Sequence, residues 1–495
     1  MKYVGISAGF HDAALSVVDD KGNILFAGHN ERYTKIKHDS EISLGLAKEA
    51  LSYVDGDDFE LHYYERPYLK YLRQLYAGEK PSLRSLNPRT FMSSGAKSLF
   101  GKKKIHTHSH HLSHAAAGFQ TSPFQEAVVV IIDAIGEFDT VTIWDAFYDQ
   151  DHKAVYKKLY SKKYPNSLGL FYSALTERVG LKPGDEEYIT MGMVAYGEPE
   201  YYAQMHTDFI QSGYDLEFTQ NLHIGFPDKY LQGVDEAVLA SSGQQLLEEL
   251  LHNVLTRAKR MTQSQNLVYG GGVALNCLAN RQLGKYFNKI WIMPNPGDAG
   301  NSLGACALGY QSQLNWNTVF LGHCIEGSYP VNIALDCLLR DRIVGVANGK
   351  AEFGPRALGN RSLLADPRGN DIKDLVNEIK RRQKFRPFAP VILEEHVNHY
   401  FVMPTGWDNC RYMQVISTCR RPDLYPAIVH ADGTSRVQTV PKDGSGIREL
   451  LEKWYVLTGC PMLLNTSLNI RGEPMVNDIN DAKRFEMVYG VKVVS

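Results

Sequence analysis

The chain has 495 residues, of which 44% are hydrophobic and 22% charged, and its formal net charge is -2. A chain of this length is expected to contain more than one hydrophobic core, and the composition is that of a globular protein. The near-zero charge argues against a nucleic-acid polymer as partner, because such binding depends on cationic side chains that contact phosphates. No apolar run approaches the length of a membrane span, so we expect no membrane insertion.

The seven cysteines are widely spread, and no CxxC pair occurs among them. Their odd number and their spacing predict reduced thiols rather than a disulfide framework. The sequence opens on MKYVGIS, which is typical of a strand, and no apolar signal region precedes it. We therefore expect a cytoplasmic protein. A basic stretch at residues 84–104 is expected to be a solvated loop rather than a binding patch.

The N-terminal part predicts three strands, at residues 3–7, 13–18 and 24–27, joined by tight turns. The first turn, SAGFHD, brings backbone N–H groups and the side chains of His11 and Asp12 to a strand tip. Actin-like ATPase folds hold a nucleotide phosphate in such a loop, although the two side chains could equally cap a turn. The charged segment that follows the third strand, ERYTKIKHD, is expected to be a solvated loop.

Two helices are then expected, at residues 42–53 and 67–76. The tyrosines in and before the second of them are expected to form a packed aromatic face; they are Tyr63, Tyr64, Tyr68, Tyr71 and Tyr76. Further on, residues 141–147 and 154–160 alternate like a hairpin, and residues 237–259 have the apolar spacing of a long amphipathic helix.

The stretch HTHSHHLSHAAAG places His110 and His114 four residues apart. On a helix this spacing puts both imidazoles on one face, where they can bind one metal ion or phosphate oxygen together. A buried strand of β-branched residues follows and delivers Asp133 to its C-terminal end, where α/β sheets keep their ligand sites. Any one of these histidines alone would be interpreted as a solvated or packed side chain.

A second strand, at residues 267–269, breaks into Gly270, Gly271 and Gly272 before the segment that contains Asn276. Successive glycines allow backbone amides to approach a phosphate or nucleoside, so nucleotide binding is favoured over a plain tight turn. The next strand ends in NPGDAGNSLG, which brings Asp298 to a similar tip. Asp298 can complete a four-ligand set with His110, His114 and Asp133, and this set suits Fe(II), Mn(II) or Zn(II).

A change of pattern near residues 320–329 places a domain boundary at 320/321, which gives domains of residues 1–320 and 321–495. In the second domain, arginines lie within stretches rich in Pro, Gly and aromatic residues, namely GPRALGNRS, RRQKFRPFAP and NTSLNIRGEP. One arginine would be interpreted as part of a structural ion pair, but several at anchored positions favour a polyanion site. They are Arg356, Arg361, Arg382, Arg386 and Arg471.

These motifs together resemble the NodU/CmcH-type O-carbamoyltransferases, and the resemblance runs through nearly the whole chain. It implies an α/β fold with an actin-like ATPase domain of the TsaD type at the N-terminus and a YrdC-like domain at the C-terminus. It further implies ATP with Mg(II), carbamoyl phosphate, Fe(II) at the four-ligand site, a small-molecule hydroxyl acceptor, and a family in which homodimers occur. The residues assigned to cofactor binding are Gly270, Gly271, Gly272, Asn276, Arg361, Arg382, Asn465, Ser467, Asn469 and Arg471.

The implied reaction converts carbamoyl phosphate and ATP into a carbamoyl-adenylate, from which the carbamoyl group passes to a hydroxyl. The arginine loops, with Arg356 and Arg386 as catalytic groups, would neutralise phosphate charge. The metal would hold and polarise the adenylate. His11, beside Asp12, is the candidate to accept the acceptor's proton, because imidazole titrates near neutral pH.

Two positions depart from the family pattern: Ile189 stands where a lysine is expected, and Gln383 where a glutamate is expected. The chain is also shorter than most relatives, which bears on the acceptor pocket. Two other functions are considered. A tRNA threonylcarbamoyl transferase is disfavoured by the near-neutral charge. An actin-like ATP-binding regulator without transferase activity would leave the histidine pair unexplained. The acceptor itself, whether antibiotic, oligosaccharide or hydroxymethylated nucleotide, is not indicated by any motif.

Overall fold

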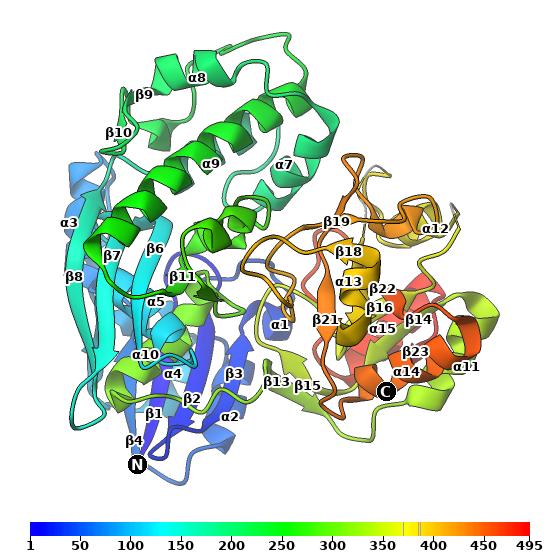
Figure 1. Cartoon of the computed structure of the whole chain (residues 1–495). Helices are drawn as coiled ribbons and strands as arrows, with labels where there is room; N and C mark the ends of the chain where they lie inside the picture. Colours follow the sequence, from blue (N-terminus) through cyan, green and yellow to red (C-terminus); the bar gives the residue numbers. More distant parts are fainter. Residues whose placement is uncertain (370, 385, 387) are drawn as a thin grey trace. The chain divides into compact units, whose positions relative to one another are not determined.

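The computed structural model describes the whole chain except Asn370, Phe385 and Pro387. The chain forms two compact units, Met1–Leu25 with Ser40–Trp316 and Phe26–Asp39 with Asn317–Ser495. Both units mix helices and strands, which confirms the predicted α/β class (Figure 1). The sequence indicated a boundary at 320/321 but not that residues 26–39 belong with the C-terminal unit. Within the described part of the chain, no helix combines the length and hydropathy needed to cross a bilayer.

The first sheet has the strand order β3-β2-β1-β4-β5. It consists of β1 (Lys2–Ser7), β2 (Ala14–Asp19), β3 (Ile24–His29), β4 (Phe59–Tyr63) and β5 (Ile105–Thr107). The central strand β1 is antiparallel to β2 and parallel to β4, and β4 is parallel to β5. The three predicted N-terminal strands are therefore confirmed, and the loop with His11 and Asp12 lies between β1 and β2.

The second sheet repeats this arrangement, with the order β12-β11-β6-β7-β8. It consists of β6 (Glu126–Gly136), β7 (Asp139–Tyr148), β8 (Ala154–Lys163), β11 (Asn266–Gly270) and β12 (Lys289–Trp291). Here β6 is antiparallel to β7 and parallel to β11, and β11 is parallel to β12. Two successive strand groups with one order and one set of orientations form the duplicated core of an actin-like ATPase fold, as expected.

Helices α5 (His110–Phe119) and α10 (Asn301–Tyr310) pack against each other, α5 also against β6 and α10 also against β1. The long helix α9 (Glu236–Met261) begins at Asp235, whose side chain accepts hydrogen bonds from the first turn, and it confirms the predicted amphipathic helix. The remaining elements of this unit are α2 (Leu44–Ser52), η1 (Leu83–Leu86), η2 (Pro88–Phe91), α4 (Ser94–Phe100), α6 (Leu168–Arg178), α7 (Glu187–Met193), η3 (Val194–Tyr196), α8 (Tyr202–Phe209), β9 (Ile210–Ser212), β10 (Glu217–Phe218), η4 (Leu222–Ile224), η5 (Gly272–Leu275), η6 (Ala279–Lys285) and η7 (Asp298–Gly300). The basic stretch at 84–104 is thus not a plain loop, since it contains η1, η2 and α4.

Helix α3 (Pro67–Tyr76) has an inverted polarity. Its charged side chains turn inward, where Lys70 pairs with Glu65 and Arg73 pairs with Glu79. Its large apolar and aromatic side chains turn outward; Tyr68, Leu72, Leu75 and Tyr76 are 54%, 51%, 48% and 70% exposed. The predicted packed tyrosine face is therefore correct for Tyr63 and Tyr64, which are buried, but wrong for Tyr68 and Tyr76. The inward ion pairs decide which face of the helix is buried.

The second unit is organised around a six-stranded sheet with the order β21-β17-β22-β16-β14-β23. Its strands are β14 (Ile343–Ala347), β16 (Arg361–Ala365), β17 (Ala389–Leu393), β21 (Gln438–Val440), β22 (Met462–Ser467) and β23 (Val493–Val494). The other elements are α1 (Glu31–Thr34), β13 (Phe320–Ile325), α11 (Val331–Asp341), β15 (Gly349–Glu352), α12 (Asp371–Ile379), η8 (Glu394–His396), α13 (Val397–Tyr400), β18 (Phe401–Val402), β19 (Ser417–Cys419), η9 (Pro426–Ile428), β20 (Thr434–Ser435), α14 (Gly446–Thr458) and α15 (Ile479–Tyr489). The charged segment at 31–39 is not a fully solvated loop, because α1 lies within it and Arg32 is buried.

Candidate active site and its metal-binding residues

Four side chains of the first unit converge at the C-terminal ends of its strands. His110 and His114 face inward from the first two turns of α5, Asp133 lies near the end of β6, and Asp298 begins η7 after β12. All four residues are buried, and one ligand atom from each lies within 4.8 Å of the others. The spacing of the histidines and the strand-end positions of the aspartates predicted this set from the sequence, and the structure brings it together.

The donor atoms are spaced as corners around a cation. Nε2 of His110 lies 3.1 Å from Oδ2 of Asp133, 3.3 Å from Oδ1 of Asp298 and 3.2 Å from Nε2 of His114. A single ring N–H cannot point at three atoms at once. Donors bound to one metal at about 2.0–2.1 Å in a tetrahedron are about 3.3–3.4 Å apart, which matches these distances. Two imidazole nitrogens and two carboxylate oxygens therefore fit a divalent transition-metal ion.

The charges of the four side chains are coupled. Burial alone would lower the pKa of His110 and His114, but the carboxylates of Asp298 and Asp133 raise both above the usual histidine value. Burial would likewise raise the pKa of the two aspartates, but the histidines lower both. Without a cation, protons on the imidazoles offset the carboxylate charges. A metal ion must displace those protons, since histidine ligates in its neutral form.

The glycine triplet lies against one of these ligands. The N–H of Gly272 donates to Oδ1 of Asp133 at 3.2 Å, which leaves Oδ2 for the histidines. Gly271 has a φ of 88°, and a Cβ atom at this position would lie 2.2 Å from the carbonyl oxygen of Ile132. The structure thus gives Gly271 and Gly272 a part in positioning Asp133. The amide of Asn276 is paired with that of Gln244 in both directions.

His11 lies at the edge of this site. Its Nδ1 is 2.8 Å from Oδ2 of Asp12, and its Nε2 is 3.9 Å from Oδ2 of Asp298. Burial opposes protonation, but the hydrogen bond to Asp12 and the charge of Asp298 raise the pKa of His11 to about 9. His11 is therefore protonated at neutral pH while Asp298 keeps its full negative charge. Neutralising the charge of Asp298 would lower the pKa of His11, while the hydrogen bond to Asp12 would continue to raise it.

A buried lysine of the second unit was missed by the sequence analysis. Nζ of Lys380 donates to the carbonyl oxygen and hydroxyl of Ser467 at 2.5 and 3.2 Å, and to the carbonyl and side-chain oxygens of Asn469, both at 2.9 Å. All four acceptors are neutral. Burial, together with the charges of Arg382 and Arg386, holds the pKa of Lys380 well below its usual range. Lys380 stands just after the end of α12, directly before two consecutive arginines. This cluster of basic residues is the feature of the sequence that could have indicated it.

The contacts of Arg361 differ from the role predicted for it. This fully buried side chain donates through Nε, Nη1 and Nη2 to the backbone carbonyl groups of Asn477, Asn348, Gly349, Asn360 and His323. A guanidinium engaged in this way holds loops together rather than facing a phosphate. Because the surrounding groups are carbonyl oxygens, we assign Arg361 to the support of the GPRALGN loop.

Among the other predicted residues of the second unit, Arg382 and Asn465 have side-chain contacts within that unit. Nε of Arg382 donates to Asn377 at 2.6 Å, and its guanidinium lies 4.0 Å from the ring centre of Phe388. The amide of Asn465 is bound to Ala357 and Gln438, so it supports the sheet. Arg356 and Arg386 are half-buried. Arg471 is exposed, and its backbone N–H donates to the carbonyl oxygen of Lys380. Phe385 and Pro387 of the FRPFAP motif lie outside the described residues.

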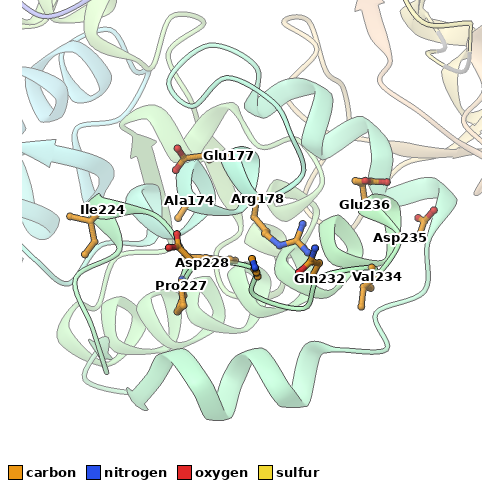
Figure 2. A pocket seen from close by; sticks show the side chains of 13 residues that line it. Ala174, Glu177, Arg178, Ile224, Pro227, Asp228, Gln232, Val234, Asp235 and Glu236 are labelled. Atoms are coloured by element: carbon orange, nitrogen blue, oxygen red, sulfur yellow. The ribbon is translucent and has the colours of Figure 1, made fainter.

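A separate cavity of about 690 Å³ lies beside α6 and the N-terminal end of α9 (Figure 2). Its charged lining includes Glu177, Arg178, Asp228 and Asp235. The guanidinium of Arg178 is bound to the carbonyl groups of Tyr230 and Leu231, so it stabilises the loop that forms the wall. None of the predicted site residues is among those that line this cavity, and the candidate site does not depend on it.

The duplicated sheets and the buried set of two histidines and two aspartates define an actin-like α/β enzyme with a candidate cation site. Residues 46–307 match the family description "Carbamoyltransferase N-terminus", and residues 335–495 match "Carbamoyltransferase C-terminus". The chain belongs to the carbamoyltransferase family, which confirms the resemblance inferred from its motifs, and it is a transferase.

Curated relatives align with most of the chain. An uncharacterised protein of Synechocystis is 30% identical over 97% of this chain and 93% of its own length. Nodulation protein NolNO of Sinorhizobium fredii is 29% identical over 95% of this chain and 76% of its own length. Nodulation protein NolO of Bradyrhizobium diazoefficiens is 32% identical over 76% of this chain and 75% of its own length.

Among solved structures, full-length HypF in the phosphate- and nucleotide-bound form has a TM-score of 0.35 and 11% identity, over 62% of this chain and 55% of that chain. This likeness is too low to bear on the function.

Proposed function

We propose that the protein is an O-carbamoyltransferase that uses carbamoyl phosphate and ATP to carbamoylate a hydroxyl group of a small molecule. Water cleaves carbamoyl phosphate to carbamate and phosphate, and a carbamate oxygen then attacks the α-phosphate of ATP and displaces pyrophosphate. The acceptor hydroxyl attacks the carbamoyl carbon of the resulting carbamoyl-adenylate, loses its proton and releases AMP. The observation that carries this proposal is the family membership of both halves of the chain together with one candidate site in each.

The phosphate chemistry is assigned to the second unit. Lys380 is buried among neutral oxygens, and the charges of Arg382 and Arg386 act on it, so positive charge is concentrated there. A bound phosphate or nucleotide would compensate this charge, which is the electrostatic requirement of adenylate formation. Ser467 and Asn469 hold the side-chain nitrogen of Lys380 in place near these arginines, so its contribution would be charge rather than a direct hydrogen bond to the anion.

Transfer to the hydroxyl is assigned to the first unit, where the ligand set of His110, His114, Asp133 and Asp298 would hold a divalent cation. When bound, that cation supplies Lewis-acid polarisation of the carbamoyl-adenylate. His11 lies beside Asp298 and would accept the proton of the acceptor hydroxyl once the carboxylate charge is neutralised. Asp12 fixes the ring of His11 through Nδ1.

The test is mass spectrometry of the purified protein incubated with ATP, Mg(II), Fe(II) and carbamoyl phosphate, without an acceptor. Carbamoyl-adenylate or AMP that forms only with carbamoyl phosphate supports the proposal. The absence of AMP, or ADP that forms whether or not carbamoyl phosphate is present, would instead support an actin-like ATP-binding regulator. Dependence of the reaction on added tRNA would favour a threonylcarbamoyl transferase.

The role of His11 is tested separately with His11→Asn. The variant should form the adenylate at the normal rate but fail to transfer the carbamoyl group to a hydroxyl acceptor. Loss of both steps would contradict the proposed division of labour.

A further inference from the structure

A buried carboxylate beside the candidate metal site has no part in the proposed reaction. Glu65 lies between β4 and α3 and is only 3% exposed. Its Oε2 is 3.7 Å from Nδ1 of His110, and its Oε1 is 2.7 Å from Nζ of Lys70. An ionised carboxylate is costly to bury unless its partners compensate it, so these contacts need a reason.

The contact with His110 concerns the ring nitrogen that faces away from the ligand set. Nε2 of His110 points to Asp133 and Asp298, whereas Nδ1 is buried and has no hydrogen-bond partner among the described residues. A histidine that binds a metal through Nε2 carries its proton on Nδ1, and a carboxylate or carbonyl usually accepts that proton. At 3.7 Å, Glu65 needs a shift of only about 0.7 Å to reach hydrogen-bond distance.

The other contacts of Glu65 hold it in this place. Lys70 comes from the inward face of α3 and also lies 3.5 Å from the carbonyl oxygen of Gly9. The hydroxyl of Tyr63 lies 3.4 Å from Oε1 of Glu65 and donates to the carbonyl oxygen of Ala8 at 2.5 Å. Glu65 is thus tied to the backbone of the loop that leads to His11. The inverted polarity of α3 has a functional explanation, because Lys70 must point inward to reach Glu65.

We propose that Glu65 is a positioning residue for metal binding: its carboxylate accepts the Nδ1–H of His110 and so fixes the tautomer that leaves Nε2 free for the cation, while Lys70 holds the carboxylate in place. This inference rests on the metal site of the proposed function. It concerns metal affinity and ligand orientation, not the binding of nucleotide or acceptor.

The test is calorimetric titration of the metal-free, full-length protein with Zn(II) and Co(II), without substrates. Glu65→Met should weaken cation binding about 10–100-fold, the usual effect of losing a carboxylate that supports a ligating histidine. Glu65→Gln keeps an oxygen acceptor and should lose less. Glu79→Gln is the matched control, because Glu79 forms the other inward ion pair of α3 and is not in contact with any of the four ligands. The cation affinity of this variant should equal that of the wild type.

A purely structural role is separated by the double variant Glu65→Met/Lys70→Met, which leaves no unpaired buried charge. Its thermal midpoint should recover relative to Glu65→Met, while its cation affinity stays low and the visible spectrum of bound Co(II) differs from that of the wild type. Wild-type affinity and an unchanged Co(II) spectrum in the double variant would overturn the inference and leave Glu65 as a mere partner of Lys70. If the wild type itself binds neither cation, the metal site fails and this inference fails with it, whereas carbamoyl-phosphate-dependent AMP formation can still stand.

Discussion

Asp133 is oriented by Gly272: the glycine N–H donates to Oδ1 at 3.2 Å, and Oδ2 is thereby left facing His110 and His114. This contact joins two parallel strands of the second sheet, because Asp133 lies near the end of β6 and Gly272 follows β11. The two backbones approach so closely that only glycine fits at position 271, beside Ile132. The geometry of the candidate metal site is therefore determined by backbone packing as well as by its ligands.

The first prediction concerns Gly271→Ala. The new Cβ atom would lie 2.2 Å from the carbonyl oxygen of Ile132, at a φ of 88° that disfavours alanine. We expect a loss of about 2–4 kcal/mol in the free energy of unfolding and weaker cation binding, because Asp133 must move. Thermal unfolding and cation titration measure both effects.

The matched control for this change is Gly180→Ala. Gly180 also has a positive φ, 77°, but a Cβ atom there meets nothing within 4 Å. It should cost about 1 kcal/mol and leave cation affinity unchanged. Equal effects of the two substitutions would mean that backbone strain, rather than contact with β6, explains the result.

The second prediction concerns Asp298→Asn. This change keeps the shape of the side chain but removes the charge shared by His110 and His114, which lie 3.3 and 3.4 Å from Oδ1. We expect loss of stoichiometric divalent metal, measured by elemental analysis after dialysis, and loss of carbamoyl transfer. Asp235→Asn, which alters a carboxylate at the start of α9, should retain the metal. Full metal content in Asp298→Asn would exclude Asp298 as a ligand.

The third prediction concerns Lys380→Met in the second unit. The ammonium group of Lys380 contacts Ser467 and Asn469, and its removal should reduce carbamoyl-phosphate-dependent AMP formation at least about 100-fold. Cation binding by the first unit should not change. Lys453→Met, on α14, is the control and should keep full activity. Normal AMP formation by Lys380→Met would remove this lysine from the proposed phosphate site.

The fourth prediction concerns the pH dependence of stability. Hydrogen bonds from Arg448 outweigh partial burial and lower the pKa of Glu395 to about 2. Because the folded-state pKa is below the unfolded value of about 4.3, the pair stabilises the protein above that pH, and the contribution is lost as pH falls toward 2. Glu395→Gln should therefore cost about 1 kcal/mol at pH 7, since Glu395 is partly exposed, and almost nothing at pH 2.

Denaturant unfolding at the two pH values measures this difference. The control is Glu449→Gln. Glu449 pairs with Lys453 on the same helix as Arg448 and is more exposed than Glu395, so its loss should reduce the free energy of unfolding little at either pH. A cost for Glu395→Gln that does not change between pH 7 and pH 2 would show that packing, rather than the ion pair with Arg448, accounts for the stabilisation.

The arrangement of the four candidate metal ligands could be predicted from sequence because each residue follows a local rule. A spacing of four residues puts His110 and His114 on one helical face, and the ends of buried parallel strands place Asp133 and Asp298 at one edge of a sheet. The strands themselves were predictable from apolar runs that end in glycine or polar turns.

The supporting residues follow no local rule. In the sequence, Lys380 and Arg361 look like solvent-exposed or phosphate-binding cations. Only the tertiary structure shows that neutral side-chain and backbone oxygens surround Lys380 and that backbone carbonyl groups surround Arg361. Glu65 is separated from His110 by 45 positions of sequence, and its role depends on how α3 packs. Residues 26–39 likewise join the C-terminal unit through contacts that no periodicity predicts.

The inverted polarity of α3 also affects how the protein behaves in solution. The helix exposes an apolar surface stripe to solvent, formed by Tyr68, Leu72, Leu75 and Tyr76. These side chains face outward because the ion pairs of Lys70 and Arg73 occupy the inward face of the helix. Surface redesign can therefore treat the two faces of the helix independently. Replacing Leu72 and Leu75 with glutamate should reduce aggregation of the protein at high concentration. The position of the Glu65 carboxylate beside His110 should not change.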